Sequence, residues 1–237
     1  RKLVALYNRF SLSDAYKVGT LEKRVNHDLR ALELYYEGIL ATSHLAKLIP
    51  YCNLGIGSED INSIALGLQL QTSREDVFMP ALSNVAQALM VFAQKEKITT
   101  MIARTHAQSA NVTTFGKEVA NPLSRLCDEV EIFASLSFQA KCSGEVGTFQ
   151  AFHGIHGNID WMEFTDTFIR SLGLRPTHTA TQIAPYDSLI RYFHSLYRIN
   201  SILLDFVKNM WLYVLLGYLR VRKVEREVGS AGMPHKV

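Results

Sequence analysis

The chain has 237 residues, of which 48% are hydrophobic and 20% are charged, enough for one large buried core or a core with a smaller neighbour. The formal charge of +3 comes from 25 basic and 22 acidic residues spread along the sequence. This even spread argues against a nucleic-acid partner, so any anionic ligand is expected in a local pocket.

Helical periodicity dominates the sequence. Apolar residues that recur every three or four positions predict amphipathic helices, and in chain order these cover Val25 to Leu40, Glu59 to Gln71, Ser73 to Glu96, Glu118 to Gln139, Trp161 to Leu172 and Ser188 to Leu219. Pro80 is expected to kink the third helix, and Asp160 to cap the fifth. Strand signals are few.

This pattern predicts an all-α fold, a bundle of long helices with functional loops at the helix ends. We place a domain boundary at Ile49-Pro50. Residues 1–48 would be the end of an N-terminal helical domain, and residues 49–237 a central helical-bundle domain. Loops rich in glycine and polar residues are expected at Asn53 to Ser58, Ser143 to Gly157 and Gly229 to Gly232.

The longest apolar stretch, Ile202 to Leu219, contains Asp205 and Lys208. Charged side chains are costly inside a bilayer, so we interpret the stretch as a bundle helix and expect no membrane partner. The three cysteines lack C-x-x-C spacing, which disfavours a disulfide framework or a zinc site and makes the cytoplasm the expected compartment. The sequence begins with Arg1 and ends abruptly at Val237, so we expect a fragment.

The first polar segment that could carry chemistry begins at Gly57. Ser58 can cap the following helix, and Glu59 and Asp60 fall in its first turn, where acidic side chains interact favourably with the helix dipole. On spacing alone, a structural cap is favoured. A functional interpretation stands beside it, because a helix N-terminus with a free hydroxyl and backbone N–H groups can bind a carboxylate.

The second polar segment runs from Arg104 to Ser109 and contains Thr105, His106 and Gln108. Histidine is the side chain whose unperturbed pKa lies nearest neutrality, so an oriented histidine can act as a general acid. A lone loop histidine is more often structural or solvated. The segment therefore gains weight only together with others.

The third polar segment runs from Gly229 to Lys236, with Ser230 six residues before the lysine. Gly229 and Gly232 allow the hinge freedom of a closing lid, although a flexible surface loop is the simpler explanation. A serine hydroxyl is a weak base unless nearby positive charge stabilises its deprotonated form. Lys236 could supply that charge.

Together these segments resemble the signature regions of the aspartase/fumarase superfamily, and within it most closely those of the adenylosuccinate lyases. The resemblance covers nearly the whole chain with matching spacing. It is carried by Asn26-His27-Asp28, Ser58-Glu59-Asp60-Ile61-Asn62, Arg104-Thr105-His106-x-Gln108, Phe115-Gly116-Lys117-Glu118, Thr181-Gln182-Ile183 and Gly229-Ser230-x-x-Met233-Pro234-His235-Lys236-Val237.

The resemblance implies a β-elimination that releases fumarate from adenylosuccinate, giving AMP, and from the succinylated aminoimidazole carboxamide ribotide of purine nucleotide biosynthesis. Ser230 would be the base that removes the Cβ proton, and His106 the acid that protonates the departing nitrogen. No metal or organic cofactor is implied. The resemblance also implies a homotetramer with sites shared among three subunits, and further bundle helices beyond Val237.

Binding roles follow from the same resemblance. Lys236 would stabilise charge on the carboxylate next to the carbanion. The succinyl carboxylates or the purine edge would be held by Ser58, Thr105 and Gln182. His27 would support the phosphate region, and Lys117 would reach the site from a bundle helix. The remaining residues expected to bind substrate are Asn26, Asp28, Glu59 and Gln108.

Several positions depart from the usual pattern. Gly57 stands in place of threonine, Ala107 in place of glycine, and Ala231 in place of the second serine of a tandem, while Ser143 to Thr148 replaces Asn-Gly-Ala-Val-Gly-Asn. Two alternatives therefore stay open: another superfamily member such as argininosuccinate lyase, and a helical scaffold of this fold that has lost turnover. The motifs at residues 26–28 and 235–237 favour the purine enzyme.

Overall fold

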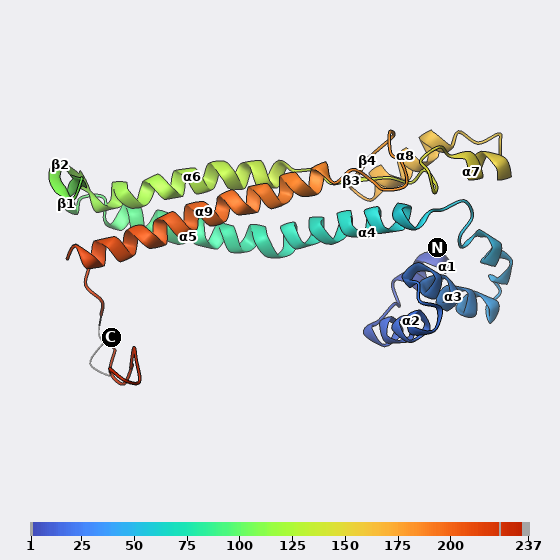
Figure 1. Cartoon of the computed structure of the whole chain (residues 1–237), viewed down its shortest axis with the longest axis horizontal. Helices are drawn as coiled ribbons and strands as arrows, with labels where there is room; N and C mark the ends of the chain where they lie inside the picture. The colour runs from blue at the N-terminus through green and yellow to red at the C-terminus, as the bar shows by residue number, and fades with distance from the viewer. Residues whose placement is uncertain (1, 223, 234–237) are drawn as a thin grey trace. The chain divides into compact units, whose positions relative to one another are not determined.

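The structure is a computed structural model that describes residues 2–222 and 224–233 (Figure 1). The chain divides into two compact units. Unit 1 comprises Arg1–Gln69 and Phe138–Pro185, and unit 2 comprises Leu70–Ser137 and Tyr186–Val237. These units are groups of residues that pack together, and they are not the predicted domains. The domain boundary between residues 48 and 49 stays a prediction.

Unit 1 combines short helices with one parallel strand pair. Asp160 accepts a hydrogen bond from the backbone N–H of Glu163, which confirms the predicted cap. The strands β3 (Gln139–Ala140) and β4 (Arg175–Pro176) run parallel. The helices are α1 (Lys2–Tyr7), α2 (Leu12–Val25), α3 (Asp28–Ala41), the 3-10 helix η1 (Ala46–Tyr51), α4 (Ser58–Ser73), which continues into unit 2, α7 (Gln150–Ile155) and α8 (Trp161–Ser171).

Helices α1 and α2 were not predicted, and the helix expected from Val25 begins at Asp28 instead. α2 buries none of its residues. Its start is fixed by Ser11, whose hydroxyl accepts the N–H of Asp14 while the Asp14 carboxylate accepts the N–H of Ser11, a capping box. α2 ends where Asn26 adopts a left-handed φ of 54°.

Unit 2 is built on three helices that run side by side (Figure 1). These are α5 (Met79–Lys95), α6 (Phe115–Ser135) and α9 (Asp187–Leu215). Val119, Leu126 and Phe133 recur every seventh residue along α6 and are fully buried. Phe133 packs against Tyr192 of α9 at a ring-centroid distance of 5.0 Å. The predicted bundle is therefore confirmed within this unit.

Two features of unit 2 add detail to the prediction: the start of α6 and the turn before Pro80. α6 begins at Phe115 rather than Glu118, because the Thr114 hydroxyl accepts the N–H of Lys117 and caps the helix. Pro80 was expected to kink the helix that contains it. The turn before it, η2 (Arg74–Phe78), winds as a π-helix, which accommodates the hydrogen bond that proline cannot donate.

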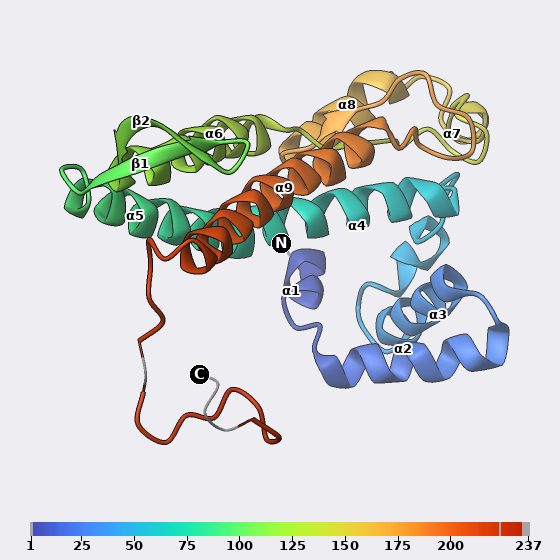
Figure 2. The same ribbon diagram turned by 60° about the vertical axis from the view of Figure 1, so that its left-hand side comes forward.

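A β-hairpin connects α5 to α6, and the sequence did not predict it (Figure 2). The strands β1 (Thr100–Thr105) and β2 (Gln108–Thr114) pair antiparallel, with an irregularity between Ile102 and Arg104. Most side chains of both strands are exposed, and Met101 of β1 is the single buried residue in the pair. The hairpin therefore carries little of the apolar and polar alternation that identifies a strand from sequence.

One described helical stretch, Ser58–Lys95, is long and apolar enough by composition to cross a bilayer, and 11% of its most apolar window is buried within the chain. Core helices of soluble bundles pass the same test of length and composition. The observation identifies an apolar helix whose surface is largely uncovered in a single chain.

Candidate functional site

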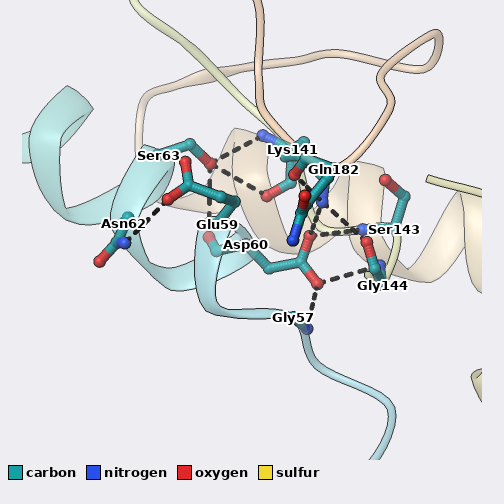
Figure 3. Close-up of polar contacts among 9 residues, drawn as sticks. All are labelled: Gly57, Glu59, Asp60, Asn62, Ser63, Lys141, Ser143, Gly144 and Gln182. Atoms are coloured by element: carbon teal, nitrogen blue, oxygen red, sulfur yellow. Dashed lines mark hydrogen bonds and ion pairs between the residues drawn. The ribbon is translucent and has the colours of Figure 1, made fainter. Parts of the chain in front are cut away.

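A buried ion pair lies at the start of α4 in unit 1 (Figure 3). Lys141 Nζ lies 2.9 Å from Asp60 Oδ1, and the two side chains are 0% and 1% exposed. A charge removed from water is tolerated only when it is paired and hydrogen-bonded. Both the Asp60 carboxylate and the Lys141 ammonium have further hydrogen-bond partners.

The Asp60 carboxylate accepts three backbone N–H groups besides its contact with Lys141. These come from Gly57 at 2.9 Å, Ser143 at 3.0 Å and Gly144 at 2.9 Å. α4 begins at Ser58, so the contact with Gly57 is the reciprocal half of a capping box. The expectation that Ser58 caps this helix is wrong in that detail, because Ser58 is the first helical residue.

The Lys141 ammonium uses its remaining donors on two main-chain carbonyl oxygens. It donates to Gly144 O at 2.7 Å and to Gln182 O at 3.0 Å, and an ammonium has three N–H groups. The backbone N–H of Lys141 is held by the Ser63 hydroxyl at 3.1 Å. Sequence reasoning missed Lys141, since a single lysine between a short strand and a loop has the signature of a solvated side chain.

The network joins three segments that are distant in sequence: the start of α4, the loop at residues 143–148 and the segment containing Gln182. A glycine reinforces the junction. Gly147 has a φ of 77°, and a Cβ atom built on it would overlap the carbonyl oxygen of Ala180. Only glycine allows the two loops to approach this closely.

Gly57, which stands in place of the threonine usual in the family, lies against Glu145 of the loop at residues 143–148. A Cβ atom on Gly57 would lie 3.1 Å from Glu145 Cα and 3.3 Å from the Glu145 carboxyl carbon. The acidic side chain therefore stands beside the space that a threonine would occupy. Glu145 also lines an open pocket of about 510 Å³, together with Asn53 and Thr148.

Two neighbouring side chains complete the surroundings of this network. The Ser143 hydroxyl oxygen is buried and has no hydrogen-bond partner among the described residues. Burial raises the pKa of the Cys142 thiol to about 11, so this thiol stays protonated and unreactive near neutral pH. Among the described residues, no cluster of three or more His, Cys, Asp or Glu side chains could hold a metal ion.

The predicted substrate residues at the α2–α3 junction are exposed and have local structural roles. Asn26 ends α2, and His27 caps α3 by accepting the N–H of Arg30 at 3.4 Å. Asp28 Oδ1 accepts the N–H of Leu29 at 2.7 Å and lies 3.3 Å from His27 Nδ1. The junction thus presents three side chains to solvent on a defined turn.

His106 lies at the tip of the β1–β2 hairpin in unit 2. Thr105 pairs with Gln108, and the two residues between them, His106 and Ala107, have φ values of 51° and 62°. Two successive positive φ angles in a two-residue loop are typical of a type I′ turn. The His106 side chain is exposed, so it is accessible to a ligand.

Arg104 and Tyr218 brace this hairpin. Arg104 donates through Nη1 to Ala107 O at 3.1 Å and through Nε to the Tyr218 hydroxyl at 2.9 Å. The Tyr218 hydroxyl donates in turn to Ile102 O at 2.7 Å. The segment after α9 therefore fixes the base of the turn that carries His106.

Lys117 and Ser230 also belong to unit 2. Lys117 is exposed in the first turn of α6, next to Gly116, where a Cβ atom would overlap the Ala93 carbonyl oxygen of α5. Ser230 is half-buried, and its carbonyl accepts the N–H of Met233 at 3.2 Å. Lys236 lies outside the described residues.

Comparison with known proteins identifies the family. A profile of the lyase family matches residues 4–237. The chain belongs to this family.

Curated members that resemble the chain are adenylosuccinate lyases. The enzyme of Haemophilus influenzae is 33% identical over 229 residues, which cover 96% of this chain and 50% of that protein. For Vibrio cholerae the identity is 34%, with 99% and 52% covered, and for Escherichia coli it is 31%, also with 99% and 52% covered. The chain spans about half the length of the curated relatives it matches.

Solved structures show the same fold. A fumarate lyase from Mesorhizobium superposes with a TM-score of 0.72 at 18% identity and covers 89% of this chain and 48% of that protein. A 3-carboxy-cis,cis-muconate lactonizing enzyme from Pseudomonas putida gives a TM-score of 0.68 at 20% identity, with 87% and 45% covered. The predicted all-α fold of the aspartase/fumarase type is confirmed.

The residues predicted for the lyase site fall into two groups. Unit 1 holds part of the binding set, and its buried network brings the segments of Ser58, Glu59 and Gln182 together. Among the described residues, no hydrogen bond or ion pair joins Ser230, the predicted base, to His106, the predicted acid. Unit 1 carries Asn26, His27, Asp28, Ser58, Glu59 and Gln182, and unit 2 carries Thr105, His106, Gln108, Lys117 and Ser230.

Proposed function

We propose that this chain is part of a lyase that eliminates fumarate from adenylosuccinate, giving AMP, and from the succinylated aminoimidazole carboxamide ribotide of purine nucleotide biosynthesis. The observation that carries the proposal is the 31–34% identity to adenylosuccinate lyases over nearly the whole chain.

The chemistry of the proposal needs a base and an acid. The Cβ proton of the succinyl group is weakly acidic, and the nitrogen is a poor leaving group unless it is protonated. In the proposal, Ser230 removes the proton and His106 delivers one to the departing nitrogen. The exposure of His106 on a braced hairpin supports its role, since an acid must be both accessible and oriented.

The substrate carries two carboxylates, and the proposal assigns them to groups that stabilise negative charge without a metal or organic cofactor. Ser58 begins α4, where the helix dipole favours an anion. Gln182 lies in the segment joined to that helix by Lys141. Lys236 is proposed to stabilise the carbanion that forms after proton removal.

The proposed assembly is a homotetramer in the cytoplasm, with each active site shared among three subunits. Large apolar side chains on α9 support an oligomer: Tyr197 is 72% exposed, Trp211 73% and Leu215 82%. Exposed apolar surface of this kind marks interaction sites. The free thiols of Cys52 and Cys127 are compatible with a reducing compartment.

The test uses the full-length protein with adenylosuccinate, followed by ultraviolet absorbance. We expect His106→Ala and Ser230→Ala each to lower turnover by a factor of about 100 or more, while helix content stays unchanged. His153→Ala, at an exposed histidine outside the proposed site, is the matched control and should keep wild-type turnover. A Ser230→Ala enzyme with near-wild-type rate would contradict the base assignment.

Mixing the two inactive variants tests the shared site. If one active site takes Ser230 and His106 from different subunits, hybrid oligomers contain some sites with both native residues and regain part of the activity. Turnover of argininosuccinate instead of adenylosuccinate would identify a different superfamily lyase. No turnover of either substrate would favour a scaffold that has lost catalysis, which the departures at Gly57 and Ala231 permit.

A further inference from the structure

We propose that Asp60 and Lys141 act as positioning residues for the substrate carboxylates, by fixing the start of α4 against the Gln182 segment through one buried salt bridge. The inference rests on the proposed function, because it takes Ser58 and Gln182 as carboxylate-binding residues. Neither Asp60 nor Lys141 is part of the proposed base–acid pair.

The contacts of the pair are directed at main-chain groups of the three segments. Asp60 makes four contacts, with Lys141 and with the N–H groups of Gly57, Ser143 and Gly144. Lys141 makes two more, with the carbonyl oxygens of Gly144 and Gln182. Each segment is therefore held by at least one charge-assisted hydrogen bond, and these are stronger than neutral ones.

Gly144 shows how tightly the loop is fixed. Its N–H donates to Asp60, and its carbonyl accepts from Lys141, so both members of the ion pair hold the same residue. The Lys141 ammonium that donates to Gly144 also donates to the carbonyl oxygen of Gln182. A shift of the pair would therefore move the Gln182 segment and the loop together relative to Ser58.

Stability alone does not explain a buried ion pair at this position. Replacing both members of such a pair with uncharged residues of similar volume is often neutral for folding, whereas removing one member leaves an uncompensated buried charge and is strongly destabilising. What an uncharged pair cannot supply is this set of directed contacts to three segments. The geometry points to positioning as the role that needs the charges.

The experiment compares three variants of the full-length protein: Asp60→Asn, Lys141→Met and the double variant. For each, kcat and KM for adenylosuccinate and the thermal midpoint are measured. We expect both single variants to lose thermal stability. In the double variant we expect part of the thermal midpoint to recover, because no unpaired buried charge remains. We expect its kcat/KM to stay about 100-fold low, mostly through KM, since misplacing binding groups by about 1 Å has an effect of this size.

A double variant that regains thermal stability relative to the single variants and also regains kcat/KM would overturn the positioning role and leave a purely structural pair. If the double variant does not fold, Ser63→Ala provides the second measurement. It removes the hydroxyl that holds the Lys141 N–H and keeps both charges. We expect a rise in KM of about 5-fold with kcat unchanged, because one hydrogen bond contributes about 1 kcal/mol; an unchanged KM would contradict the proposal.

The two proposals fail differently. A wild-type protein without turnover of adenylosuccinate or the succinylated ribotide would overturn the proposed function, and the positioning role with it. An active wild-type protein with a fully active double variant would overturn the positioning role alone.

Discussion

Ala107→Gly is expected to stabilise the hairpin that carries His106. Ala107 has a φ of 62° at the second central position of the turn. The left-handed conformation costs a residue with a Cβ atom about 1–2 kcal/mol. Glycine avoids this cost but loses about 0.4–1 kcal/mol through the greater entropy of the unfolded chain. The balance is a local gain of roughly 0.5–1 kcal/mol.

Hydrogen exchange of the β1 and β2 amides measures this gain locally. A rise of roughly 0.5–1 kcal/mol in the free energy of hairpin opening slows exchange about 2- to 5-fold. Ala103→Gly is the matched control, because Ala103 lies in β1 outside the positive-φ region, and glycine there should speed exchange. Exchange that is unchanged or faster in Ala107→Gly would refute the account of the turn.

The remaining predictions concern packing, pH and substrate charge. Gly147→Ala should lower the thermal midpoint strongly, because its Cβ would overlap a main-chain oxygen at positive φ, whereas Gly154→Ala has open space and should not. The Arg198 guanidinium lowers the pKa of Glu129 below its usual value. This pair therefore stabilises the fold above the unfolded pKa of about 4.3 and loses that contribution as pH falls through the lower folded value. Glu129→Gln should flatten acid denaturation curves in that range, and an unchanged curve would count against the pair. Glu145→Gln should lower KM for adenylosuccinate, since it removes a negative charge beside the proposed carboxylate site; a raised KM would contradict this placement.

The long helices could be predicted from the sequence because their apolar residues pack against one another. Val119, Leu126 and Phe133 are fully buried on one face of α6, so the period of the sequence matches the period of the contacts. The β1–β2 hairpin could not be predicted in this way. Its strands are mostly exposed, and its only turn signal, His106-Ala107, lacks the glycine or asparagine that usually marks such a turn.

The binding segments could be found from their motifs, but the pair that joins them could not. Asp60 was assigned to the first turn of a helix, where an acidic residue has a sufficient local explanation. Lys141 has no local partner in the sequence, and its ion pair depends on a contact between distant segments. Tertiary contacts of this kind leave no periodic signal, so the structure was needed to reveal them.

The most direct test of the proposed function is product analysis with the full-length protein. The protein is incubated with adenylosuccinate, and fumarate and AMP are quantified separately by chromatography. The proposed elimination predicts equal amounts of both products in the wild type and their loss in His106→Ala. Absence of both products in the wild type, or AMP without fumarate, would contradict the proposed elimination.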